Sequence, residues 1–229
     1  MLLKYYQKLD DAISYLLAST ANEGGLLKKV FKKKPIFLVD IGANEGSFID
    51  FIDKNLLLKK IYCFEPITEL SQKIKKRYNR KNLYISNLAL SDKAGKKIFY
   101  QYAITSTSSL YKQNNTYKSL KDLKKTFKVE TNRFDKIFNK KQKIDICKID
   151  VQGEDYNVLL GMKKNLQNKN IKLLKVELSF INFYQNTSAN FYKILHYLEK
   201  FNYRIVSITK IKFKDNKLIF VDAYFQYKK

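Results

Sequence analysis

The sequence predicts a single α/β domain with a Rossmann-like, mostly parallel sheet that carries helices on both faces. Over the first 90 residues, short apolar runs alternate with stretches whose apolar residues recur at helical spacing, and this order favours a parallel, doubly wound sheet. The run Ile36–Ile41 is almost wholly apolar, as is typical of a strand buried on both faces. A chain of 229 residues fits one such domain with a short N-terminal extension.

Residues 1–34 are expected to form that extension, and residues 35–229 the domain proper. Apolar residues at helical spacing predict a helix over 3–20, which could dock on the sheet or mediate dimerisation. Consecutive glycines predict a turn at Asn22–Gly25, and Lys28–Lys34 is interpreted as a basic linker. We expect the extension to end there, because Pro35 directly precedes the first apolar run.

The remaining elements follow from the same periodicities. Strands are expected at residues 36–41, 60–65, 82–90, 97–103, 143–150, 172–178, 203–209 and 218–227. Helices are expected at residues 48–57, 68–78, 156–166 and 188–201, with Thr68 or Ser71 as an N-cap for the second. Hairpin turns are predicted at Asp92–Gly95 and Lys212–Asn216, and the polar stretch 105–128, within a variable insert at about 91–130, is interpreted as a lid.

The composition excludes several classes of protein. No apolar stretch is long enough to cross a bilayer, and the charged amino terminus does not resemble a signal peptide, so a cytoplasmic protein is expected. Cys63 and Cys147 fall in predicted core strands and are expected to be buried, reduced thiols. With one histidine and no closely spaced cysteine pair, a zinc site is not expected.

The net charge of +24 would suit an anionic partner, but only four of the 45 basic residues are arginine. Nucleic-acid-binding proteins usually use arginine for bidentate contacts, so a nucleic-acid partner is not favoured. Because lysine rises together with asparagine along the chain, a compositional bias explains the charge at least as well. An anionic substrate or a peripheral membrane contact is the alternative.

A glycine-containing turn follows the first strand in the segment Val39–Gly46. It lacks the three spaced glycines with which dinucleotide-binding proteins hold a pyrophosphate. A cofactor without phosphates, such as S-adenosylmethionine, does not need them. Asp40 could organise its ammonium, Gly42 would allow close backbone approach, and the start of the following helix would suit its carboxylate.

Acidic residues recur where later strands end. Glu65, at the end of the second strand, is placed to accept two hydrogen bonds from a ribose diol. Asp150 ends an apolar strand and should face the same crevice, because ligands of open α/β sheets bind beyond the carboxyl ends of the strands. Glu177 ends the next strand and could position the acceptor. His196 lies beside the apolar stripe of its helix and is interpreted as an exposed surface residue.

Three further polar residues crowd the turn after Asp150, namely Gln152, Glu154 and Asp155. Close carboxylates raise one another's pKa, which suits a general base, and they could also hold a divalent cation. Glu154 and Asp155 could equally be structural residues at the start of the next helix. These residues are therefore candidates for assisting a substrate or a metal, with no metal assigned.

Together these segments resemble the FkbM family of methyltransferases. The matching stretches are Val39–Gly46, Phe64–Pro66, Asn87–Asp92, Lys148–Asp155, Val158–Gly161 and Val176–Glu177. Two departures occur: Arg133-Phe134-Asp135 replaces the family's common Thr-Leu-Asp, and the later acidic motif carries Gln152 and Asp155 where Glu is usual. The first departure lies near the predicted lid, so it bears on the acceptor rather than on the cofactor.

The resemblance implies a class I methyltransferase fold, with a seven-stranded sheet whose final strand is antiparallel and with flanking helices. It implies S-adenosylmethionine as cofactor and O-methylation of a sugar, glycan or related small-molecule hydroxyl. The implied cofactor-binding residues are Asp40, Gly42, Ala43, Asn44, Gly46, Ser47, Glu65, Pro66, Leu88, Ala89 and Asp150. Asp150 and Glu177 are the candidate catalytic residues. The alternatives are a non-catalytic relative of the fold, or an RNA or protein methyltransferase that uses its basic surface.

Overall fold

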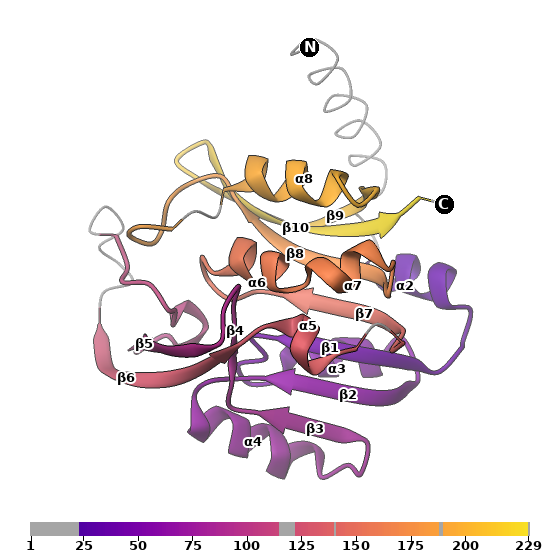
Figure 1. Cartoon of the computed structure of the whole chain (residues 1–229), viewed down its shortest axis with the longest axis horizontal. Coiled ribbons are helices and arrows are strands. Elements are labelled where there is room, and N and C mark those ends of the chain that lie inside the picture. Colours follow the sequence, from indigo (N-terminus) through magenta and orange to yellow (C-terminus); the bar gives the residue numbers. More distant parts are fainter. Residues whose placement is uncertain (1–22, 115–121, 140, 188–189, 229) are drawn as a thin grey trace.

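A computed structural model describes residues 23–114, 122–139, 141–187 and 190–228 (Figure 1). The expected helix over residues 3–20 lies outside these residues. The main sheet has seven strands, all parallel except for one antiparallel strand near its edge. In spatial order the strands are β3 (Leu83–Ser86), β2 (Leu58–Phe64), β1 (Ile36–Ile41), β7 (Ile144–Ile149), β8 (Ile171–Ser179), β10 (Lys217–Tyr227) and β9 (Tyr203–Lys214). The predicted fold class, including the antiparallel final strand, is confirmed.

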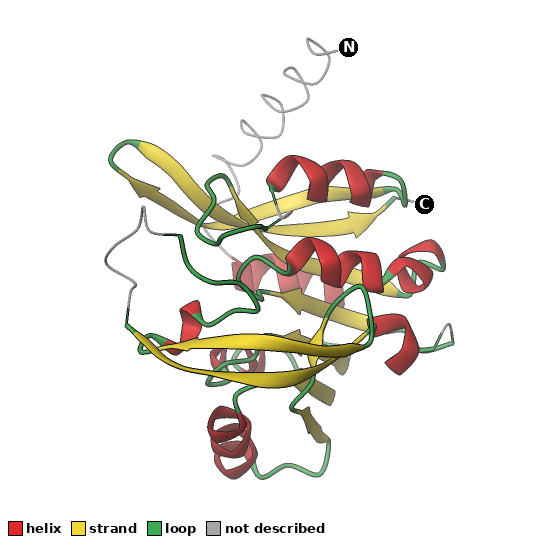
Figure 2. Ribbon diagram, turned by 60° about the vertical axis from the view of Figure 1, so that its left-hand side comes forward, coloured by secondary structure: helices red, strands yellow, loops and turns green. Residues whose placement is uncertain are grey.

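Helices cover both faces of this sheet and make a three-layer structure (Figures 1 and 2). One face packs against α2 (Glu23–Phe31), α3 (Ser47–Asp53) and α4 (Thr68–Tyr78). The other packs against α5 (Phe134–Ile137), α6 (Asp155–Gly161), α7 (Lys163–Gln167) and α8 (Phe191–Glu199). Strand β1 lies in the middle of the core and alternates between the layers: Ile36 and Leu38 pack against the first set of helices, Phe37 and Val39 against the second.

Helix α2 occupies the segment for which the sequence predicted a turn and a basic linker. That prediction was wrong, because tertiary contacts outweigh the low helix propensity of two glycines. Leu27 and Phe31, four residues apart, are both buried against the sheet. Glu23 at the start of α2 accepts a hydrogen bond from the Tyr224 hydroxyl and pairs with Lys175 of β8 at 2.8 Å. The helix is thus tied to the sheet by apolar and ionic contacts.

A second sheet of three strands lies beside the carboxyl ends of the main one. It is ordered β4 (Ala89–Leu90), β6 (Leu123–Asn132), β5 (Gly95–Tyr102), followed by a short 3₁₀ turn, η1 (Thr105–Thr107). The single strand expected over 82–90 is therefore two, in different sheets. The turn at Asp92–Gly95 is not a β-hairpin, because β6 lies between β4 and β5. Part of the expected polar lid is the strand β6, and residues 115–121 of it lie outside the described residues.

Two smaller expectations about helices also failed. The helix expected over 156–166 is divided into α6 and α7 at Met162, whose fully buried side chain sits on a backbone at φ −96°, ψ 3°. Helix α4 spans the predicted residues, but Ile67 precedes it and no side chain caps it. The Ser71 hydroxyl instead donates to the Thr68 carbonyl oxygen, an alternative local bond that serine often makes.

The chain ends in the β9–β10 hairpin, as predicted for Lys212–Asn216. Asp215 and Asn216 form its turn with φ of 50° and 57°, values that favour these short polar residues. Before it reaches this turn, strand β9 carries a bulge, where Lys210 and Ile211 face the single residue Val221 of β10. Lys210 takes a φ of 47°, which is uncommon for a lysine. The bulge turns the outer half of β9 relative to its inner half.

Candidate active site

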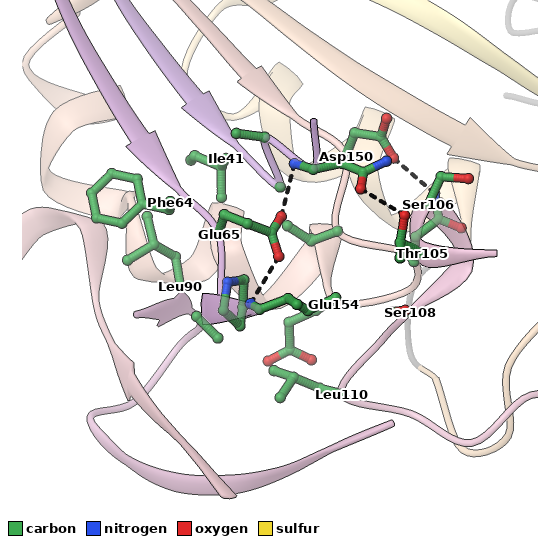
Figure 3. A pocket seen from close by; sticks show the side chains of 18 of the residues that line it. Ile41, Phe64, Glu65, Leu90, Thr105, Ser106, Ser108, Leu110, Asp150 and Glu154 are labelled. Carbon is green, nitrogen blue, oxygen red and sulfur yellow. Dashed lines mark hydrogen bonds between the residues drawn. The ribbon is translucent and has the colours of Figure 1, made fainter. Parts of the chain in front are cut away.

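A cavity of about 910 Å³, open on one side, lies beyond the carboxyl ends of β1, β2 and β7 (Figure 3). This is where open α/β sheets bind their ligands. Nine of the predicted cofactor-binding residues line it: Gly42, Ala43, Asn44, Ser47, Glu65, Pro66, Leu88, Ala89 and Asp150. Asp40 and Gly46, the other two, do not line it. Apolar side chains from β2, β4 and β5 form one wall, among them Phe64, Leu90 and Phe99.

Glu65 is held rigidly at the end of β2. Its Oε2 accepts the backbone N–H of Asn44 at 2.8 Å and its Oε1 that of Ile67 at 2.9 Å. Burial raises its pKa to about 7, although both backbone hydrogen bonds act in the opposite direction. Each oxygen retains a second lone pair on the cavity side, so the carboxylate can accept further hydrogen bonds from a bound diol. The residues therefore fit a ribose-containing cofactor.

The two turn glycines are required by packing within the protein, and Gly42 also lines the cavity. A Cβ at Gly42 would lie 2.0 Å from the carbonyl oxygen of Asp150, and φ there is 77°. A Cβ at Gly46 would meet the ring of Tyr78 at 2.9 Å. Gly42 therefore allows the turns after β1 and β7 to touch, which places Asp150 at the cavity floor.

A buried ion pair lies beneath this floor. Lys148 of β7 has Nζ 3.1 Å from Asp40 Oδ1, 3.0 Å from the Gly42 carbonyl oxygen and 3.6 Å from Asp150 Oδ2. Burial lowers the pKa of Lys148, but the charges of Asp40 and Asp150 more than offset this and raise it. Asp40 is fully buried, and its Oδ2 has no hydrogen-bond partner among the described residues. Sequence reasoning treated Lys148 only as a strand residue and missed this role.

Asp150 stands at the boundary between the cofactor cavity and a second cavity. Its Oδ1 accepts a hydrogen bond from Gln152 Nε2 at 2.8 Å. The loop after β5 closes this side, because the Ser109 hydroxyl donates to the Gln152 carbonyl oxygen at 2.6 Å. The Thr105 hydroxyl also donates to Asn44 Oδ1 at 2.9 Å, and Figure 3 shows Thr105 and Ser106 on the loop beside Asp150. Part of the predicted lid thus contacts the cofactor turn directly.

The second cavity, of about 960 Å³, joins the first along Ser106, Asp150, Gln152 and Lys210. Glu177 of β8 lines it and does not line the cofactor cavity. Aromatic rings and lysines complete its wall, namely Phe183, Tyr184, Phe220, Lys212 and Lys214. Sequence analysis assigned no role to these five residues, because they follow the recognised motifs and only the fold brings them to Asp150.

The two candidate catalytic carboxyls have opposite pKa shifts. Burial acts to raise the pKa of Asp150. The charge of Lys148 and the hydrogen bond from Gln152 act in the opposite direction, and the pKa lies below its ordinary value. Burial and the charge of Asp150 raise the pKa of Glu177 well above its usual range. Asp150 is therefore an ionised acceptor at neutral pH, whereas Glu177 holds a proton more strongly. Such a divergence distinguishes carboxylates with different tasks.

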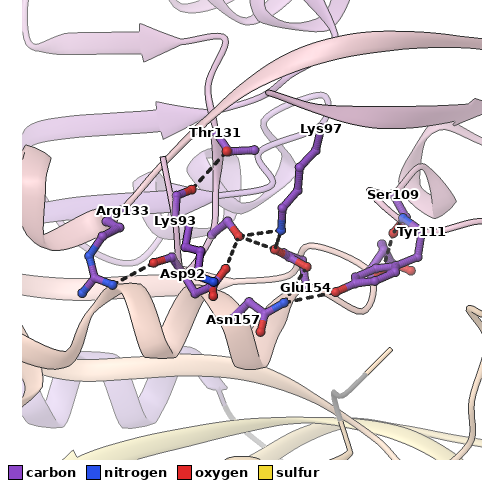
Figure 4. A network of polar contacts seen from close by, with 11 residues as sticks. Asp92, Lys93, Lys97, Ser109, Tyr111, Thr131, Arg133, Glu154 and Asn157 are labelled. Atoms are coloured by element: carbon purple, nitrogen blue, oxygen red, sulfur yellow. Dashed lines mark hydrogen bonds and ion pairs between the residues drawn. The ribbon is translucent and has the colours of Figure 1, made fainter. Parts of the chain in front are cut away.

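Glu154 and Asp155 are occupied by contacts within the protein. Glu154 Oε1 accepts from Ser91 Oγ at 2.5 Å and from Lys97 Nζ at 2.7 Å, while Oε2 accepts from Asn157 Nδ2 at 3.0 Å (Figure 4). Asp155 accepts the backbone N–H groups of residues 151 and 153. Burial raises its pKa to about 7. Both carboxyls hold the turn that carries Asp150 and Gln152, and Glu154 also lines the cofactor cavity.

The departure at Arg133-Phe134-Asp135 is explained by packing. Arg133 forms a two-pronged ion pair with Asp135 and donates to the Asp92 carbonyl oxygen at 2.7 Å. Phe134 is fully buried in the core. None of the three lines either cavity, so this motif supports the turn at Asp92 and does not contact an acceptor.

The described residues include both cysteines and the single histidine of the sequence. Within them, no group of three histidine, cysteine or acidic side chains is arranged to hold a metal ion. Cys63 and Cys147 are buried free thiols, and His196 is exposed, as predicted. No helix in the described part of the chain has the length and apolar character needed to cross a membrane. The cytoplasmic location stays a prediction.

Comparison with known proteins identifies the family. The methyltransferase FkbM domain matches residues 40–205, more than half of the chain and the whole stretch from Asp40 to the start of β9. The chain belongs to the FkbM methyltransferase family. The resemblance read from the motifs is thereby confirmed, and with it an S-adenosylmethionine-dependent methyltransferase. No curated protein matches the chain.

Solved structures support the fold of this FkbM methyltransferase. An rRNA methylase from Streptococcus thermophilus is similar with a TM-score of 0.50 and 12% identity, covering 90% of this chain and 94% of that one. The N-methyltransferase NodS from Bradyrhizobium japonicum WM9 is similar with a TM-score of 0.51 and 9% identity, covering 91% and 96%. At these identities the likeness concerns the fold alone.

Proposed function

We propose that this FkbM methyltransferase transfers a methyl group to a hydroxyl of a sugar or a related small polyol. The observation that carries the proposal is the second cavity, which meets the cofactor cavity at Asp150 and contains Glu177. Aromatic rings of Phe183, Tyr184 and Phe220 on its wall suit the apolar faces of a sugar ring. Polar side chains at the junction suit its hydroxyls.

Each site residue has a task in this proposal. Glu65 accepts hydrogen bonds from the cofactor ribose, and Asp40 with Lys148 holds the turn against which the cofactor's amino-acid portion binds. When bound, S-adenosylmethionine supplies a methyl group on a sulfonium, whose departure as a thioether needs no proton. Alignment of the acceptor oxygen with this methyl group can contribute about 7–11 kcal/mol.

The acceptor hydroxyl must lose its proton as its oxygen bonds to the methyl carbon. We assign the proton to Glu177 in its ionised form, because a carboxylate with a raised pKa is the better base. Asp150, ionised and fixed by Gln152, accepts a hydrogen bond from the acceptor and orients it. This assignment reverses the order suggested by sequence, which placed Asp150 first.

Cofactor binding is tested by calorimetric titration with S-adenosylmethionine and S-adenosylhomocysteine. Glu65→Ala should weaken both by at least about tenfold, because it removes charged acceptors of two hydrogen bonds. Glu69→Ala is the matched control, since Glu69 is an exposed residue on α4 that pairs with Lys125. Failure of the native protein to bind either compound would refute the cofactor site.

Catalysis is tested with labelled S-adenosylmethionine and a panel of sugars and polyols. Glu177→Gln should lower turnover by about 10²–10⁴-fold with little change in cofactor affinity, and Asp150→Asn should also collapse turnover. Glu199→Gln, an exposed change on α8, should have no effect. Full activity of Glu177→Gln would remove it as the base.

RNA, protein or amino-group methylation is the alternative acceptor chemistry, as the names of the two structural neighbours illustrate. The scarcity of arginine argues against RNA. Labelling of RNA with a strong dependence on salt, in place of labelling of sugars, would favour that alternative.

A further inference from the structure

The outer half of β9 gives the second cavity a positive wall. Lys210, Lys212 and Lys214 all line the cavity. Asp150 and Glu177 are the carboxyls that line this cavity, so positive side chains outnumber negative ones even when both carboxyls are ionised. A neutral acceptor would not require this excess.

The bulge in β9 is what brings Lys210 to the junction. Its backbone φ of 47° is unfavourable for a lysine, and such local strain is retained when the surrounding structure enforces it. The residue lines both cavities, and its Nζ lies 5.2 Å from the centre of the Phe220 ring, which helps to hold the side chain in place. Lys212, two residues further along β9, lines the second cavity but not the cofactor cavity.

We propose that the acceptor is anionic, carrying a phosphate or a carboxylate that Lys210 and Lys212 bind, with Lys214 at the rim of the cavity. The inference rests on the proposed methyl transfer and adds the class of acceptor. Two residues of strand span about 7 Å, so the anionic group lies roughly one sugar ring away from the hydroxyl at Asp150 and Glu177. A sugar phosphate or a uronic acid meets this requirement.

The spacing also explains why the anion does not sit between the catalytic carboxyls. Asp150 and Glu177 would repel it there, whereas Lys212 and Lys214 line the second cavity without reaching its junction with the cofactor cavity, and they attract it. Opposite charges at the two ends of the cavity therefore set the direction in which the acceptor enters. A hydroxyl is presented to the carboxyls and the charged group remains outside.

The test compares glucose, glucose 6-phosphate and glucuronate by calorimetric titration at constant ionic strength, with the enzyme saturated with S-adenosylhomocysteine. The native enzyme should bind at least one anionic sugar about tenfold or more tightly than glucose. Lys212→Gln should weaken the anionic sugar by about 3- to 10-fold without a change for glucose, and Lys210→Gln should weaken the anionic sugar by about 5- to 30-fold. The two anionic sugars distinguish a phosphate from a carboxylate.

Lys193→Gln on α8 is the control, because this exposed lysine lines neither cavity. Lys212→Gln must retain the native affinity for S-adenosylhomocysteine, since Lys212 lies outside the cofactor cavity. Equal binding of charged and neutral sugars, binding of none of them, or equal losses in Lys212→Gln and Lys193→Gln would overturn the inference. In each of these cases, labelling of a neutral sugar or polyol by the native enzyme would leave the proposed function standing.

Discussion

Replacing Lys148 with methionine should destabilise the protein strongly, because the change leaves Asp40 as an uncompensated buried charge. The Lys148 side chain is 12% exposed and that of Asp40 is 0% exposed, so water cannot replace the lost partner. Breaking a buried ion pair on one side typically costs about 3–5 kcal/mol. Asp40 can lose its charge only by taking a proton. Protonating a carboxyl of ordinary pKa at pH 7 costs about 4 kcal/mol, which lies within the range for breaking a buried ion pair.

Urea unfolding of Lys148→Met and the native protein, at pH 7 and pH 5, measures this effect. Burial already raises the pKa of Asp40 in the native protein, and removing the opposing charge of Lys148 raises the folded-state pKa further above its unfolded value. The associated stability is present at low pH and is lost as the pH rises. The deficit in unfolding free energy should therefore shrink by about 1.4 kcal/mol for each unit that the pH falls.

Two further variants make the reasoning refutable. The double change Asp40→Asn with Lys148→Met should recover much of the loss, because no buried charge remains. Lys125→Met breaks an exposed pair, with Lys125 and Glu69 side chains 50% and 60% exposed, and should cost about 1 kcal/mol or less. A deficit below about 1 kcal/mol in Lys148→Met, or one that does not change with pH, would contradict the proposed role of the pair.

Two other predictions follow from the turns around the cofactor cavity. Gly42→Ala should cost at least about 2 kcal/mol of stability and weaken S-adenosylhomocysteine binding, because its Cβ would lie 2.0 Å from the Asp150 carbonyl oxygen. Thermal unfolding measures the stability and calorimetry the binding. A variant with native stability and native binding would contradict the contact. Burial raises the pKa of Asp155 from 3.8 to about 7, so its contribution to stability is present below about pH 4 and is lost as the pH rises through about 7. Asp155→Asn should therefore flatten the dependence of unfolding free energy on pH between these values, and a steeper dependence would refute the assignment.

The sequence predicted the alternation of strands and helices along the chain and the cofactor crevice because both depend on local patterns. The run Ile36–Ile41 is a strand at the predicted residues, since its periodicity and burial point to the same state. Glu65 lies at the crevice because strand ends in a parallel sheet share one edge. Helix α2 could not be predicted, because its glycines argue against a helix and tertiary contacts stabilise it, among them those of Glu23 with β8 and β10.

The second cavity could not be predicted for a related reason. Its lysines belong to a strand paired antiparallel at the far edge of the sheet, and a bulge sets the direction of Lys210. A short sequence motif predicts neither the register of a hairpin nor the position of a bulge. Lys148 was missed because a lysine inside an apolar run normally extends its amine to solvent, whereas here Asp40 lies on the adjacent strand β1.

One wall of the second cavity is formed by residues that lie outside the family match. The match to the FkbM domain ends at residue 205, and the wall formed by β9 and β10 is built from residues that follow it. Apart from Lys210, the residues that line the cofactor cavity lie within the match, whereas residues of the match and of the β9–β10 hairpin share the second cavity. Exchanging residues 206–228 between relatives would be a direct route to new acceptor specificity, because such a change leaves Glu65, Asp150 and the buried Asp40–Lys148 pair untouched.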